Sequence, residues 1–207
     1  MVSLQSNSML VLASSSLRRQ ELLRNARILF KTQPAEIPEI RRAGEPPADF
    51  ARRLACEKAH AVFESMLPPA GTFVLGADTV VIVDNEVLGK PVDESDAVRM
   101  LRLLSSRRHE VTTGVCLVGH DATDGNPGGK RVFEDVRAET TEVFFASLSD
   151  DSIQDYVATG EPLDKAGAYA IQGVASRWVT RISGDYFNVM GLPVALVCRM
   201  LQEHGAL

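Results

Sequence analysis

The segment LASSSLRRQELL, residues 12–23, joins three serines to two adjacent arginines at the expected start of a helix. Backbone N–H groups at a helix N-terminus point outward and attract anions, and serine hydroxyls add further hydrogen-bond donors. Arg18 and Arg19 oppose the helix dipole by about 0.3–1 kcal/mol each. A bound anion would reverse that sign, and the planar guanidinium suits phosphate oxygens. The alternative is a serine cap followed by two solvated arginines, and this segment alone leaves both interpretations open.

A single carboxylate, Asp78, interrupts the apolar run FVLGADTVVIV at residues 73–83. Because its neighbours predict a buried strand, an unpaired charge would be costly there, so Asp78 should be protonated or meet a cation. Gly76 allows the close approach of a backbone or a ligand. A buried carboxylate near a phosphate site is suited to bind Mg²⁺ or to activate water as a base. The alternative is a structural ion pair with a core arginine.

Three further residues give weaker signals. Lys58 lies in the helical pattern RLACEKAHAVF, where a lysine is usually solvated. Lys90 precedes Pro91 after an expected hairpin, and the restricted backbone would direct its side chain reproducibly. Glu39, in AEIPEI, could complete a metal site with Asp78. None of the three is informative alone.

The late segment DKAGAYAIQG, residues 164–173, is rich in small residues that permit close contact with a planar ligand. Gln172 offers both a donor and an acceptor, the pairing that a uracil or thymine edge requires. A glycine-bearing turn with a capping glutamine would have the same composition, so both interpretations stand.

These residues must be positioned by helices and strands in mixed order, which predicts an α/β fold with a mixed sheet. The proline-rich residues 33–48 and the polar residues 119–130 predict loops, and the sequence does not reveal a role for the second. We expect one domain over residues 1–207, with two lobes. The expected helices are 15–24, 47–66, 93–104, 150–159 and 189–203, and the expected strands are 9–13, 73–83 with a short return strand, 110–118, 131–145 and 178–182.

Composition excludes several classes of protein. The net charge of −5 and a pI near 5.4 provide no basic field for nucleic acid or an anionic membrane. No run approaches the length of a membrane-spanning helix, and the N-terminus lacks the charged leader of a signal peptide, so we expect a cytoplasmic protein. The three cysteines are far apart and show no disulfide or zinc spacing, so we expect core thiols. The four histidines show no ligand spacing either, so we expect surface or structural residues. The sequence also lacks a Walker loop, a GxGxxG motif and a GxSxG motif.

Taken in order, LASSSLRRQELL, RLACEKA, VLGADTVV, GKP, DKAGAYAIQG and GDYFNVMGLP resemble the Maf family of nucleoside triphosphate pyrophosphatases. The resemblance covers nearly the whole chain. It implies an elongated mixed β-sheet flanked by helices, in two lobes with a central cleft. It also implies hydrolysis of a nucleotide between its α and β phosphates with a divalent cation, Mg²⁺ or Mn²⁺.

The same resemblance assigns roles to individual residues. Asp78 would accept the proton of the attacking water, and Glu39 would join it around the metal. The residues that would hold the triphosphate are Ser14, Arg18, Arg19, Lys58 and Lys90. Arg18, Thr79 and Gln172 match the branch that acts on dTTP and UTP, which implies a role in removing noncanonical pyrimidine nucleotides.

The resemblance leaves a second class of function open, a nucleotide-binding regulator of cell division without turnover. Asp78 favours the enzyme, because a sensor has no use for a base that activates water. The expected partner is a nucleoside triphosphate, with no nucleic acid and no membrane. The oligomeric state stays open, with a homodimer as the commonest assembly among proteins that associate.

Overall fold

The computed structural model describes residues 8–120 and 132–207 and contains two compact units. The first unit comprises the described residues of Met1–Asp78, Thr113–Ala138 and Gly191–Leu207. The second comprises Thr79–Thr112 and Glu139–Met190. The three longest strands each contribute residues to both units.

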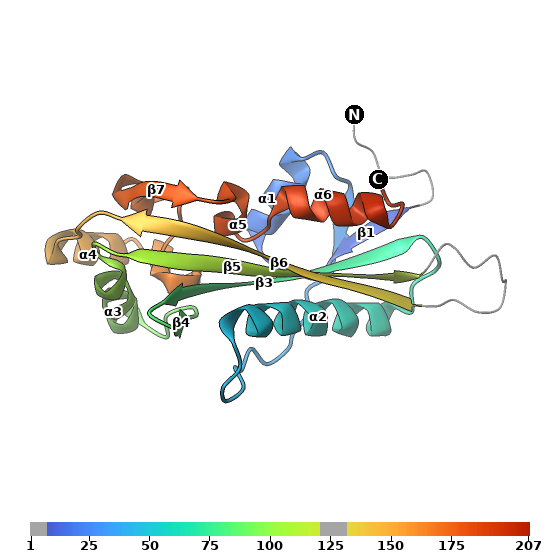
Figure 1. Cartoon of the computed structure of the whole chain (residues 1–207), viewed down its shortest axis with the longest axis horizontal. Coiled ribbons are helices and arrows are strands. Elements are labelled where there is room, and N and C mark those ends of the chain that lie inside the picture. The colour runs from blue at the N-terminus through green and yellow to red at the C-terminus, as the bar shows by residue number, and fades with distance from the viewer. Residues whose placement is uncertain (1–7, 121–131) are drawn as a thin grey trace. The chain divides into compact units, whose positions relative to one another are not determined.

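A seven-stranded mixed sheet and six α-helices make up the described fold, which confirms the predicted α/β class (Figure 1). The strand order is β2-β1-β3-β5-β6-β7, and β4 pairs with β3. The strands are β1 Met9–Leu12, β2 Phe30–Thr32, β3 Thr72–Val83, β4 Glu86–Leu88, β5 Arg108–His120, β6 Val132–Phe145 and β7 Val179–Ser183. The helices are α1 Leu17–Asn25, α2 Pro47–Met66, α3 Glu94–Leu104, α4 Asp150–Val157, α5 Tyr186–Met190 and α6 Val194–Glu203.

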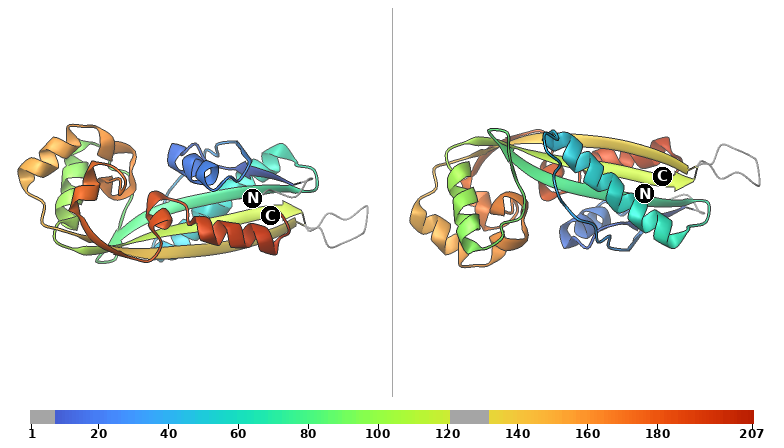
Figure 2. Two further views of the ribbon diagram at one scale, coloured as in Figure 1. Left: turned by 90° about the horizontal axis from the view of Figure 1, so that it is seen from above. Right: turned by 90° about the horizontal axis from the view of Figure 1, so that it is seen from below.

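In the first unit, β1 runs parallel to both β2 and β3, and its Leu12 pairs with Leu75. Figures 1 and 2 show α2 along one face of the sheet in this unit, and α1 and α6 along the other face. The core beneath α2 is built from small and branched residues. Its buried members are Val11, Ala13, Ala55, Ala59, Val62, Phe63, Val74, Cys116 and Val118.

Two strand glycines let α2 lie directly on the sheet. A Cβ atom added at Gly76 of β3 would lie 2.0 Å from the carbonyl oxygen of Ala55, and one added at Gly114 of β5 would lie 2.3 Å from that of Ala51. Both distances are far below van der Waals contact. The absence of these two side chains therefore sets how closely the helix approaches β3 and β5.

The second unit has its own core, in which Tyr156 and Trp178 pack edge to face with ring centroids 5.2 Å apart. A two-residue turn joins β3 to β4 through Asp84 and Asn85, both with positive φ, which matches a tight hairpin. Asp93 and Ser149 cap α3 and α4 by accepting bonds from backbone N–H groups. Three short 3-10 turns follow α4: Glu161–Asp164, Ala166–Ala168 and Val174–Trp178.

The predicted elements are present with three differences. The expected helix over 189–203 is wrong at residues 191–193, because Gly191 at φ 113° and Pro193 separate α5 from α6, which covers the rest of the predicted range. Strand β2 was not predicted. Residues 119 and 120 extend β5, and most of the predicted loop 119–130 lies outside the described residues. None of the helices in the described residues could serve as a membrane span, since each is too short or too polar.

Candidate active site

The serine-arginine segment forms the turn from β1 into α1, as predicted. Ser16 caps the helix, and its hydroxyl accepts a bond from the backbone N–H of Arg19 at 3.4 Å. The Ser14 hydroxyl accepts two bonds, one from the N–H of Ser16 and one from Nη1 of Arg19, each 3.2 Å long. The cap and the first-turn arginine are thus linked through one buried serine.

Arg19 is buried rather than solvated, with 9% of its surface exposed. Its Nε donates to the carbonyl oxygen of Gly191 at 2.8 Å, which fixes the guanidinium against the segment before α6. Burial lowers the pKa of Arg19, and the positive charge of the half-buried Arg18 lowers the pKa further. The negative charge of Asp78 acts in the opposite direction. The interpretation of two freely solvated arginines is therefore wrong for Arg19.

Asp78 of β3 is buried and pairs with a lysine rather than with a core arginine. Nζ of Lys58, from α2, lies 2.6 Å from its Oδ1 atom. Burial raises the pKa of Asp78, while the positive charges of Lys58 and Arg19 act against the rise. Asp78 is therefore paired with a cation, Lys58, as predicted, and Arg19 interacts with it through charge.

The Lys58 ammonium also contacts the Glu39 carboxylate, whose Oε1 lies 2.6 Å from Nζ. Only 8% of Lys58 is exposed, whereas Glu39 is at the surface. Two carboxylate oxygens therefore converge on one cationic point. Hard oxygen donors arranged in this way suit Mg²⁺ or Mn²⁺, so the residues present fit the metal that the resemblance implies.

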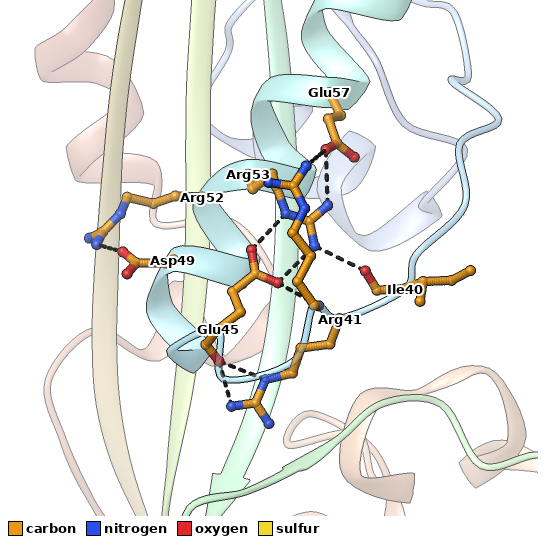
Figure 3. A network of polar contacts seen from close by, with 8 residues as sticks. Ile40, Arg41, Glu45, Asp49, Arg52, Arg53 and Glu57 are labelled. Carbon is orange, nitrogen blue, oxygen red and sulfur yellow. Dashed lines mark hydrogen bonds and ion pairs between the residues drawn. The ribbon is translucent and has the colours of Figure 1, made fainter.

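The loop that carries Glu39 is fastened by Arg53, a residue that sequence analysis missed (Figure 3). Arg53 donates to both carboxylate oxygens of Glu45, at 2.6 and 2.8 Å, and to the carbonyl oxygen of Ile40 at 3.0 Å. It also bonds Glu57, one turn along α2, at 2.9 Å. The bonds from Arg53 to the Glu45 carboxylate, helped by the backbone N–H of Arg42, lower the pKa of Glu45 to about 2. The i, i+4 pair with Glu57 was the one visible signal in the sequence.

The remaining predicted residues, Thr79, Lys90 and Gln172, belong to the second unit. Thr79 directly follows Asp78 in β3 and is half-buried, and Lys90 is exposed after β4. The carbonyl oxygen of Gly89 accepts a 3.0 Å bond from the N–H of Gly167. The turn after β4 is therefore tied to the start of the AGAYAIQG loop.

Gln172 is exposed on a turn whose backbone is fixed by hydrogen bonds. The N–H of Gly173 donates to the carbonyl oxygen of Ala170 at 3.0 Å, and the N–H of Ala170 donates to the Tyr156 hydroxyl at 3.2 Å. Tyr156 in turn donates to Glu161 at 2.8 Å. This network fixes the backbone around Gln172 and leaves its amide at the surface, as base recognition requires.

The structure brings together six of the nine predicted residues within the first unit. Arg19 connects to Ser14 by a hydrogen bond and to Arg18, Glu39 and Asp78 through charge, and Lys58 bridges the two carboxylates. Such an arrangement can bind a polyphosphate with its cations and present a carboxylate to water. The predicted roles themselves stay predictions.

The chain is similar to known proteins over nearly its whole length. The family model described as Maf-like protein matches residues 9–204. A dTTP/UTP pyrophosphatase of Koribacter versatilis (strain Ellin345) is 54% identical over 198 residues, which is 96% of this chain and 95% of the relative. Proteins with the same name from Geobacter sp. (strain M21) and Symbiobacterium thermophilum are 49% and 50% identical, over 97% and 95% of this chain and 98% and 94% of theirs.

Proposed function

The chain belongs to the Maf-like protein family, and we propose that it hydrolyses dTTP and UTP to the nucleoside monophosphate and pyrophosphate. The observation that carries the proposal is the buried Asp78 carboxylate, held 2.6 Å from the Lys58 ammonium in the unit that also contains Ser14 and Arg19. Relatives about half identical to the chain bear the name of this activity.

In the proposed reaction, Asp78 takes the proton of the attacking water. A carboxylate with a raised pKa is a better base near neutral pH than an ordinary aspartate, and burial has this effect on Asp78. The positive charge of Lys58 opposes the rise in pKa, so the pairing favours the ionised carboxylate, which is the form that can accept a proton. The pair thus supports the assignment of Asp78 as the base.

The basic residues bind the triphosphate and stabilise the charge that develops as pyrophosphate leaves. Arg19 suits this role because Gly191 and Ser14 already fix its guanidinium, so little ordering is needed on binding. The Ser16-capped N-terminus of α1 adds backbone N–H donors. We assign Arg18 to the same triphosphate.

Glu39 and Asp78 are the residues that would hold a divalent cation, because carboxylate oxygens are the donors such ions prefer and both side chains reach the Lys58 ammonium. When bound, Mg²⁺ or Mn²⁺ would supply positive charge to the phosphate oxygens. Arg18, Thr79 and Gln172 would select the pyrimidine base. The amide of Gln172 can donate to and accept from the edge of uracil or thymine.

A panel of nucleoside triphosphates, with Mg²⁺ or Mn²⁺ and scored separately for pyrophosphate and orthophosphate, tests the proposal. We expect pyrophosphate and a monophosphate, with dTTP and UTP hydrolysed faster than purine nucleotides. Orthophosphate as the first product would refute the cleavage position. Tight nucleotide binding without turnover would instead favour a regulatory protein.

A further inference from the structure

A cluster of metal-ligating side chains lies in the first unit, apart from the residues assigned to catalysis. It comprises Cys56 of α2, Cys116 of β5 and Glu134 of β6. One ligand atom from each residue, the two Sγ atoms and a carboxylate oxygen, lies within 4.8 Å of the other two. Three separate elements therefore direct their donor atoms to one place.

The sequence predicted no such cluster, because 60 residues separate the two cysteines and no short ligand motif surrounds them. The prediction of core thiols holds for Cys116, which is buried, but Cys56 is half-buried and faces it. Contact between α2 and neighbouring strands of the sheet creates the proximity.

The donor set suits a soft divalent metal ion. Zinc binds thiolates at about 2.3 Å and carboxylate oxygens at about 2.0–2.2 Å, which places tetrahedral ligand atoms about 3.6–3.8 Å apart. Donor atoms within 4.8 Å of one another therefore need to move by only about 1 Å to share one ion. Thiolate ligands select zinc over magnesium, calcium and manganese, which prefer oxygen. We propose that Cys56, Cys116 and Glu134 form a binding site for a thiophilic divalent metal ion, with zinc as its natural occupant.

A fourth side chain orients the carboxylate of this cluster. His60, one turn after Cys56 on α2, has its Nε2 atom 2.5 Å from Oε2 of Glu134. Carboxylates that ligate metals are commonly held by such outer hydrogen bonds. The Glu134 side chain is 45% exposed and that of His60 36%, so an ion can reach the cluster from solvent and keep a water ligand.

The cluster is distinct from the carboxylates assigned to the catalytic metal. Cys56 and Lys58 are two residues apart on α2, which separates their directions by about 200° around the helix. Lys58 turns toward Asp78 of β3, whereas Cys56 turns toward β5. An ion at the cysteines would join α2 to the two strands and stabilise the helix that carries Lys58.

Cobalt titration tests the site with a signal that the catalytic carboxylates cannot give. Thiolate ligands produce an intense near-ultraviolet charge-transfer band with Co²⁺, and oxygen ligands do not. We expect the fully reduced, metal-free whole chain to develop this band with one equivalent of Co²⁺ and to lose it when Zn²⁺ is added. The Asp78→Asn variant should give the same band.

Variants identify the ligands. Cys56→Ser should abolish the band, and Cys198→Ser, which removes the remaining half-buried thiol on α6, should leave it unchanged. His60→Ala removes a surface side chain and should keep the band while weakening cobalt affinity by about 10–100-fold. This variant tests the site even if Cys56→Ser fails to fold.

Three results would overturn the proposal. The first is the absence of the band when thiol titration shows that the cysteines are reduced. The second is a band of full strength in folded Cys56→Ser, and the third is cobalt affinity unchanged in His60→Ala. Elemental analysis of protein grown with zinc should agree, with about one zinc ion lost between the wild type and Cys56→Ser.

Discussion

Replacing Gly76 by alanine should separate the two residues on which the proposed chemistry depends. The added Cβ atom would lie 2.0 Å from the carbonyl oxygen of Ala55 and 2.9 Å from the N atom of Ala59, both in the backbone of α2. Because real Cβ atoms essentially never approach within 3.0 Å, helix and strand must part by about 1 Å at this point. Backbone atoms, unlike a side chain, cannot rotate out of the way.

This displacement acts directly on the ion pair. Lys58 lies three residues beyond Ala55 on α2, and Asp78 lies two residues beyond Gly76 on β3, so parting the elements lengthens the 2.6 Å contact. Overpacking of this kind costs about 1–3 kcal/mol of stability. A misplacement of about 1 Å at a reacting group can cost about 100-fold in rate. Activity should therefore fall far more than the folded fraction does.

The assay compares kcat/KM for dTTP with the melting temperature, using Gly119→Ala as the matched control. Gly119 is also a strand glycine of the first unit, but its added Cβ would meet the ring edge of Phe133, which can rotate. We expect Gly119→Ala to keep most of its activity. Gly76→Ala with turnover within a factor of two of Gly119→Ala would refute the reasoning. If Gly76→Ala does not fold, Lys58→Gln should show the same loss of turnover with α2 in place.

Three further predictions concern ionisation and loop anchoring. The ammonium of Lys58 lowers the pKa of Asp78, so Lys58→Gln should move the acid limb of the kcat/KM profile to higher pH; an unmoved limb would contradict the pairing. Burial lowers the pKa of His109 to about 4, so its contribution to stability is complete above the unfolded value near 6.5 and is lost as pH falls toward 4, by about 3 kcal/mol at most. Urea unfolding of His109→Gln should therefore change less between pH 7.5 and 5 than that of the wild type. Arg53→Ala should loosen the loop before α2, lower kcat/KM by about 10–100-fold and raise the metal concentration needed, whereas Arg52→Ala, whose partner is Asp49, should do neither.

Local signals in the sequence predicted most of the fold. The helix at Pro47–Met66 was predicted to the residue, because a proline marks its first turn and an apolar face runs along it. The prediction of the C-terminal helix failed where Gly191 and Pro193 interrupt an otherwise helical pattern. Strand β2 has only three residues, too few for an alternation to be visible.

The sequence singled out the six residues that lie together in the first unit, but it did not predict how they pair. Asp78 stood out as a charge within an apolar strand, yet its partner lies 20 residues away on a helix, where a lysine is usually solvated. Burial of Lys58 follows from the close packing of α2 on β3, which no local pattern encodes. Arg53 and the two facing cysteines depend in the same way on contacts between distant segments.

The most direct test of the account compares dTTP binding and hydrolysis in the wild type and in Asp78→Asn, which keeps the shape of the side chain and removes the base. The melting temperature reports whether the variant folds, because Lys58 loses its ionised partner at residue 78 but keeps its contact with Glu39. We expect the variant to bind dTTP with similar affinity and to release pyrophosphate about 10²–10⁴-fold more slowly. Turnover at the wild-type rate in the variant would contradict the assignment of Asp78 as the base.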